Sequence, residues 1–266
     1  MTIKNNTDDL AKQLLEMNEG LATAFDDLEW TTKKLGWIYN PLDYAREPAR
    51  NYLETYGLKR GRRALWIGMN PGPWGMAQTA VPFGDVVAAR DWMGLSGEVE
   101  QPEVLCDKKP VEGYALERRE GSGKRLWGWI EQRWGTPQNF FDECFVWNYC
   151  PLMFLEKENA RNLTPNNLYK ADREALLPIC DEALRQLVVY LQPEWIIGVG
   201  KFAHGRAKVA AKSLDDPPRV ATVLHPSPAS PAANNGWDQK AEAQLADQGV
   251  VFDNWLEQPP EELIIS

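Results

Sequence analysis

The sequence contains few residues of the types that bind metal ions: only two of its 266 residues are histidines and four are cysteines. None of the cysteines forms a C-x-x-C pair, because Cys106, Cys144, Cys150 and Cys180 are separated by 38, 6 and 30 positions. This spacing argues against a zinc ribbon or an iron–sulfur cluster, and two histidines are too few for a multi-histidine site. We therefore expect no metal site and four reduced, mostly buried thiols.

Long apolar runs and an export signal are also missing. No apolar stretch approaches the roughly 18 residues that a membrane helix requires. The first ten residues lack a basic region followed by an apolar one, which predicts a chain that stays in the cytoplasm and has no membrane partner. With 44% hydrophobic and 25% charged residues, the composition is typical of a soluble protein of one or two domains with a sizeable core.

Basic residues are scarce at both ends of the chain, whose net charge is −9. Residues 1–30 carry seven acidic and two basic side chains, and residues 241–266 carry six acidic and no basic ones, which leaves +2 for residues 31–240. Net charge therefore does not exclude a nucleic-acid partner. We expect an acidic helical segment at 1–30, a single domain at 31–250 and an acidic tail after residue 250.

Four short apolar runs are typical of buried strands, and they alternate with helical patterns. The strands are expected at residues 64–68, 144–148, 195–199 and 219–224. The helices are expected at residues 8–25, 83–92, 124–134, 164–191 with an interruption at Pro178, 201–212 and 236–246. This alternation predicts a three-layer α/β/α sandwich around a short, mainly parallel four-stranded sheet. In such a sheet the ligand binds where the strands end, so the loops after the strands are the candidate site.

Two of these loops carry short motifs. Residues 68–72 read Gly-Met-Asn-Pro-Gly, and residues 225–228 read His-Pro-Ser-Pro. A third loop, residues 198–203, matches the loose G-x-G-x-x-A dinucleotide pattern. That match is weak, because the next strand does not end in an acidic residue, and we interpret the third loop as a tight strand-to-helix turn.

The first two motifs resemble the two signatures of the uracil-DNA glycosylase superfamily. The resemblance to its single-strand-selective monofunctional members extends over about residues 60–250 and is carried by residues 68–84, 145–152, 161–165 and 198–237. It implies a base-excision repair enzyme that hydrolyses the N-glycosidic bond of uracil, and of 5-hydroxymethyluracil, in DNA and leaves an abasic site. It also implies a monomer without cofactors that binds single-stranded and double-stranded DNA, associated with the nucleoid in a bacterium or located in the nucleus of a eukaryote.

The resemblance assigns the chemistry to residues of these loops. Asn70 would orient the attacking water, because an amide does not titrate near neutral pH and cannot act as a base. His225 would donate a hydrogen bond to uracil O2 as negative charge builds there. Phe83 would stack on the flipped base, and Asn148 would read its edge. Further contacts with the base are expected from Met69, Gly72 and Met76.

The resemblance also implies contacts with DNA outside the base pocket. These contacts are expected at Lys157, Arg161, Asn162, Lys201, Ser227, Pro228 and Ala229. Ala229 and Asn235 stand where the family often has Arg and Lys, and Trp147 stands where His is common. The two missing charges lie in the loop expected to wedge into the base stack, which weakens the expected grip on duplex DNA.

Other interpretations are open at this point. Asn70 would also suit a tight turn before Pro71, and a lone histidine is more often structural, as we expect for His204 within its helix. In a second interpretation, the chain is an enzyme of the same fold that acts on hypoxanthine or xanthine. A third possibility is a DNA-binding protein with weak catalysis, although the presence of both Asn70 and His225 argues against it.

Overall fold

The predicted strands form one parallel sheet. The computed structural model describes residues 2–257, and for residues 2–8 only the backbone. The sheet consists of β2 (Ala64–Gly68), β3 (Cys144–Asn148), β6 (Trp195–Val199) and β7 (Arg219–Val223), in the order β3-β2-β6-β7. Every residue of β2, β3 and β6 is buried, as expected where helices cover both faces of a parallel sheet. The four predicted strands are therefore confirmed, with the last one ending a residue early.

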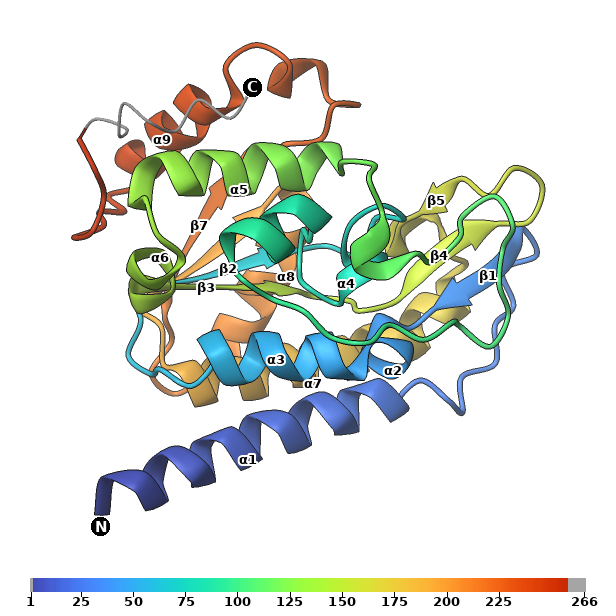
Figure 1. Cartoon of the computed structure of the whole chain (residues 1–266), viewed down its shortest axis with the longest axis horizontal. Coiled ribbons are helices and arrows are strands. Elements are labelled where there is room, and N and C mark those ends of the chain that lie inside the picture. The colour runs from blue at the N-terminus through green and yellow to red at the C-terminus, as the bar shows by residue number, and fades with distance from the viewer. Residues whose placement is uncertain (1, 258–266) are drawn as a thin grey trace.

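Helices form a layer on each face of this sheet (Figure 1). One layer contains α5 (Gly121–Trp134), α9 (Trp237–Asp247) and a short π-helix at Ala88–Trp92. The other contains α3 (Arg46–Tyr56), α7 (Lys170–Leu191) and α8 (Lys201–Lys212), with α1 (Thr2–Thr23) packed outside against α3 and α7. The shorter elements are α2 (Pro41–Tyr44), α4 (Met76–Thr79), α6 (Pro137–Glu143) and 3-10 turns at Gly113–Ala115, Pro165–Asn167 and Pro231–Ala233. The arrangement confirms the predicted α/β/α sandwich.

A second, antiparallel sheet was not predicted from the sequence. It consists of β1 (Leu35–Tyr39), β4 (Met153–Glu156) and β5 (Asn162–Leu163), in the order β1-β4-β5. Strand β5 has only two residues, too few for a period-2 pattern to show in the sequence. This small sheet matters for the site, because β4 and β5 follow β3 in the chain and the sheet holds the segment around Asn162 against the loop after β2.

Two predicted helices differ from the structure. The helix expected at 83–92 begins only at residue 86, because Phe83 lies in a turn with a left-handed backbone angle (φ 53°). The helix expected from residue 164 is preceded by a separate 3-10 turn, and α7 begins at Lys170. Pro178 does not interrupt α7; it lies on the exposed side, where water can replace the backbone hydrogen bond that proline cannot make.

The described parts of both chain ends pack against the central domain. Leu14 and Leu21 of α1 are buried in the core, and Phe252 stacks on Trp66 with 6.2 Å between ring centroids. Residues 258–266 of the expected acidic tail lie outside the described residues. The four cysteines are free and buried, as predicted. Among the described residues, no helix is long and apolar enough to cross a membrane.

Candidate active site

The loops after the four parallel strands meet at the carboxyl edge of the sheet. Between β2 and β6 the strand order reverses direction, which is the position where sheets of this kind bind ligands. A cavity of 260 Å³ opens there. It is lined by Met69, Asn70, Gly72, Pro73, Gly75, Met76, Phe83, Glu120, Ser122, Asn148, Asn162, Thr164, His225 and Ser227. The structure thus brings nine of the residues singled out in the sequence into one cavity.

Phe83 and Asn148 lie directly against the last residue of β2. A Cβ atom added at Gly68 would come within 2.2 Å of Asn148 Oδ1 and 2.5 Å of a Phe83 ring carbon, so only glycine leaves room for both side chains. The Phe83 carbonyl is fixed by hydrogen bonds from Trp127 Nε1 (3.1 Å) and from the Asp85 backbone N–H (2.7 Å). These bonds stabilise the left-handed turn and hold the ring at the cavity.

The side-chain amide of Asn70 is oriented by backbone carbonyls. Its Nδ2 donates to the carbonyl of Leu163 at 3.2 Å and lies 3.5 Å from that of Leu152. Within residues 9–257 no protein group donates to Asn70 Oδ1. Because the nitrogen side of the amide faces the small antiparallel sheet, the oxygen is left as an acceptor for a group inside the cavity.

His225 is a neutral hydrogen-bond donor. Burial lowers its pKa to about 4, so the ring carries no charge at neutral pH. The Ser227 backbone N–H donates to His225 Nδ1 at 3.1 Å, and the ring proton therefore resides on Nε2. The backbone of Gly200 is left-handed (φ 88°), and a Cβ there would lie 3.2 Å from the Cβ of His225, which favours glycine at the close approach of the loops after β6 and β7.

The remaining base contacts expected from the sequence also lie in this cavity. Asn148 is almost completely buried, and its Nδ2 lies 3.1 Å from the sulfur of Met76. The Met69 carbonyl accepts from the Cys150 backbone N–H at 2.9 Å, which fixes the start of the loop after β2. The ring of Phe83 lies 6.0 Å from that of His225 and is tilted by 41°. Together these groups surround a space between one aromatic face and several polar atoms.

The residues expected to contact DNA divide into two groups. Asn162 and Ser227 line the cavity, where Asn162 Nδ2 donates to the Pro71 carbonyl at 3.1 Å. The others lie outside it: Lys157, Arg161, Lys201, Pro228 and Ala229 are exposed on the surface. Arg161 pairs with Glu156 at 3.1 Å. His204, interpreted as structural, places Nδ1 at 3.2 Å from the Ala221 carbonyl.

Sequence reasoning missed Glu120 and Ser122 in the cavity wall. Glu120 is the N-cap residue of α5, where its side chain accepts from the Gly123 backbone N–H. Burial raises the pKa of its carboxyl group above the usual value. An acidic residue just before an apolar helical pattern is a capping signal, but nothing in the sequence places this cap beside the loop after β2.

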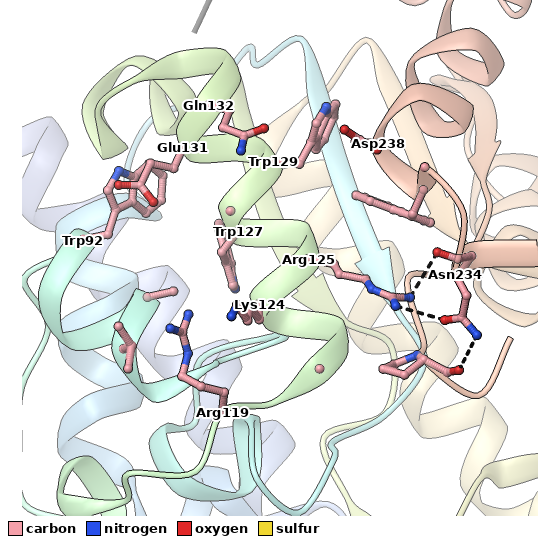
Figure 2. Close-up of a pocket in the computed structure, with 18 of the residues that line it drawn as sticks. Trp92, Arg119, Lys124, Arg125, Trp127, Trp129, Glu131, Gln132, Asn234 and Asp238 are labelled. Carbon is pink, nitrogen blue, oxygen red and sulfur yellow. Dashed lines mark hydrogen bonds between the residues drawn. The ribbon is translucent and has the colours of Figure 1, made fainter. Parts of the chain in front are cut away.

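A larger cavity of 710 Å³ runs along α5 (Figure 2). It contains none of the expected catalytic residues, but its wall connects α5 to the loop after β7. Arg125 donates to the Pro226 carbonyl (3.0 Å), the Ala233 carbonyl (3.1 Å) and Asn234 Oδ1 (2.9 Å). Asn234 Nδ2 in turn donates to the Pro228 carbonyl at 3.0 Å. One guanidinium therefore holds the loop that carries His225 in place.

Comparison with known proteins identifies relatives that all belong to one superfamily. The model of the uracil DNA glycosylase superfamily matches residues 56–246. The chain is 45% identical over 242 residues to the single-strand selective monofunctional uracil-DNA glycosylase of Rattus norvegicus, covering 91% of this chain and 86% of that protein. It is 44% identical over 245 residues to the protein of the same name from Mus musculus, covering 92% and 87%.

The fold also resembles a solved structure. The crystal structure of wild-type Pedobacter heparinus SMUG2 superimposes with a TM-score of 0.62, covering 90% of this chain and 98% of that chain. The two sequences are 17% identical, so this likeness concerns the fold alone.

Proposed function

The chain belongs to the uracil-DNA glycosylase superfamily, and from this membership we propose that the 260 Å³ cavity holds a uracil flipped out of DNA. The chain is a monofunctional uracil-DNA glycosylase, which hydrolyses the N-glycosidic bond of uracil and leaves an abasic site in base excision repair. A single base suits a cavity somewhat below the range of about 300–1,000 Å³ that is usual for larger ligands. The mechanism rests on one observation, namely that Asn70 and His225 face the same cavity from different loops.

Breaking the N-glycosidic bond leaves positive charge on the sugar and negative charge on the departing uracil. A water molecule must then attack the sugar carbon. Asn70 is suited to orient this water, because its Oδ1 is a free acceptor and its Nδ2 is held by the carbonyl of Leu163. An amide does not remove a proton, so the bond to uracil must be largely broken before the water attacks. Placement of the water, rather than its deprotonation, is then the contribution of Asn70.

The negative charge on uracil requires a donor that is in place before the reaction. His225 offers Nε2–H to uracil O2, since its Nδ1 already accepts from the Ser227 backbone. The neutral ring is consistent with this role, because Nε2–H remains a donor while Nδ1 accepts from the Ser227 backbone. Removing one such donor typically costs about 10²–10³-fold in rate.

The walls of the cavity supply recognition of the base. Phe83 offers a flat face for stacking, and the amide of Asn148 can accept from uracil N3–H and donate to O4. Near Gly72 the first protein atom that an added Cβ would meet is Glu120 Oε1, at 3.6 Å. This space would admit a hydroxymethyl group on C5 and provide it with an acceptor, which supports 5-hydroxymethyluracil as a second substrate.

The proposal extends to a monomer that binds both single-stranded and double-stranded DNA, and exposed residues support the contact with DNA. Lys157, Lys201 and Ala229 are exposed, and the loop at Ser227, which lines the cavity, would fill the space left by the flipped nucleotide in a duplex. A single strand needs no such filling. Single strands are therefore the substrate that depends least on this loop, to which Ala229 contributes no charge.

The function is tested with single-stranded oligonucleotides that each contain uracil, 5-hydroxymethyluracil, hypoxanthine or xanthine, followed by alkali to reveal abasic sites. Uracil should be excised fastest. Asn70→Ala and His225→Ala should each reduce excision at least about 100-fold, whereas His204→Ala, which removes the other histidine, should retain it. No product from any of the four bases, or equal losses in His204→Ala and His225→Ala, would contradict the proposed function or these residue roles.

A further inference from the structure

Two cations converge on one aromatic ring beside the active-site cavity. Lys109 Nζ lies 4.8 Å from the centroid of the Trp74 ring, and the Arg118 guanidinium carbon lies 4.3 Å from it. Trp74 is partly exposed and follows Pro73 and precedes Gly75, both of which line the cavity. Contacts of this kind favour the cations by about 0.5–2 kcal/mol each, and they hold two like charges at the edge of the site.

These two cations lack the carboxylate partners that some other arginines of the described residues have. Arg119 pairs with Asp85 at 2.7 Å, and Arg161 pairs with Glu156 at 3.1 Å. In the described part of the chain, no acidic side chain forms an ion pair with Lys109 or Arg118. An unneutralised pair of cations beside the cavity attracts an anionic ligand to this part of the chain, whose residues 31–240 carry a net charge of +2.

A buried side chain fixes the ring relative to Lys109. Gln78 is fully buried, and its Nε2 donates to the Pro73 carbonyl (2.8 Å) and the Pro110 carbonyl (2.9 Å). Its Oε1 accepts from the backbone N–H groups of Glu112 (2.8 Å) and Gly113 (3.1 Å). All four hydrogen-bonding positions of one amide therefore connect the loop of Trp74 to the segment that follows Lys109.

A buried carboxylate fixes the segment of Arg118 in the same way. Asp85 is fully buried and accepts from Arg119 Nε at 2.8 Å and from the Glu120 backbone N–H at 2.9 Å. Glu120 itself lines the cavity. The positions of both cations are thus coupled to the cavity wall through buried hydrogen bonds, which reduces the ordering cost of binding an anion.

We propose that Trp74, Lys109 and Arg118 form a binding site for a phosphodiester of the DNA strand that enters the cavity. The proposal rests on the function proposed above, because a nucleotide flipped into the cavity must place its flanking phosphates at the rim. Arg118 is suited to a two-pronged contact with phosphate oxygens and Lys109 to a point contact, while Trp74 positions both. The site flanks the cavity, because Trp74 stands between Pro73 and Gly75 in the cavity wall.

The test measures binding of the full-length chain to a fluorescent single-stranded oligonucleotide that carries a tetrahydrofuran abasic analogue, which the enzyme cannot hydrolyse. Fluorescence anisotropy gives Kd over a series of KCl concentrations for Arg118→Gln and Lys109→Gln. The matched control is Arg219→Gln, because Arg219 also stacks on a tryptophan (3.9 Å from the Trp195 centroid) but lies at the start of β7, the opposite edge of the sheet.

Each of the two variants should reduce the slope of log Kd against log salt by up to about 0.7, the value for the one phosphate that both cations contact, and weaken binding about 5-fold near 0.1 M salt. Arg219→Gln should leave both unchanged. Trp74→Leu should weaken binding and Trp74→Phe should restore it, because the phenyl ring keeps a face for the cations. On uracil substrates, Arg118→Gln should raise KM and leave kcat unchanged. Removing the nucleotides on the side of the analogue that this site contacts should abolish the difference in Kd between Arg118→Gln and the parent.

If Arg118→Gln and Lys109→Gln bind with the same salt dependence as Arg219→Gln, the phosphate site is overturned, even when uracil is excised normally. Conversely, if the parent chain excises no uracil but the two variants lose its salt-dependent binding, the proposed function is contradicted and the phosphate site is supported. A parent chain that does not bind the oligonucleotide would refute both.

Discussion

Replacing Asn148 by Asp separates base recognition from general catalysis. The change keeps the shape of the side chain but removes the donor that faces uracil O4 and puts an acceptor in its place. Asn148 is only 4% exposed, so water cannot replace the missing donor. An unpaired buried acceptor costs about 1–3 kcal/mol, which corresponds to a loss of about 5- to 150-fold in uracil excision at neutral pH.

The dependence on pH gives this prediction a second readout. The carboxyl group introduced at position 148 would be buried beside Met76, so its pKa should lie above the usual value for aspartate. Once protonated, it donates again to O4. The ratio of the rate of Asn148→Asp to that of the parent should therefore rise as the pH falls through that raised pKa, whereas the ratio for a purely structural defect would stay constant.

The assay is abasic-site formation in single-stranded oligonucleotides that carry one uracil, or only normal bases including cytosine, between pH 5 and 8. A carboxylate can accept from the amino group of cytosine, so a small gain on cytosine is expected as well. The control is Asn139→Asp, because the Asn139 amide also donates to a carbonyl, that of Trp134 at 2.9 Å, but lies in α6, away from the cavity. Uracil excision within a few-fold of the parent at every pH would refute the assignment of Asn148 to the base edge.

Three further perturbations test the loop after β7 and the histidine at its start. The free energy of unfolding should fall by about 3 kcal/mol between pH 6.5 and pH 4, because the unfolded chain binds a proton at His225 that the folded chain excludes. Chemical denaturation at several pH values measures this fall, which should be smaller for His225→Asn. Arg125→Ala removes three hydrogen bonds from the loop and should slow excision from duplex DNA more than from single strands, and equal slowing on both substrates would argue against a loop that acts on the duplex. Ala229→Arg should add one phosphate contact, and steeper salt dependence with a higher ratio of duplex to single-strand activity is the expected result.

The sequence alone determined the central sheet and the edge of it at which the candidate site residues meet. The runs at 64–68 and 144–147 are apolar throughout because both faces of a parallel strand are buried, and such runs are recognisable without knowledge of their partners. The same topology places the loops after the strands at one edge, so Asn70, Asn148 and His225 could be expected to meet there. Their proposed roles came from the resemblance of the two motifs and not from this geometry.

Contacts between distant segments were decided only by the tertiary structure. Strand β5 has only two residues, and β1, β4 and β5 were recognised only through their pairing with one another. The backbone of Phe83 adopts a left-handed turn that its own preference disfavours, because Trp127 and Asp85 hold its carbonyl group.

The electrostatic character of the site depends on the same long-range packing. Burial and the Ser227 backbone together make His225 a neutral donor whose proton resides on Nε2. Trp74 and Arg118 are far apart in the chain, and nothing in their local sequence indicates that they meet. They do so because the buried amide of Gln78 and the buried carboxylate of Asp85 each require hydrogen-bond partners, and only the folded chain brings those partners together.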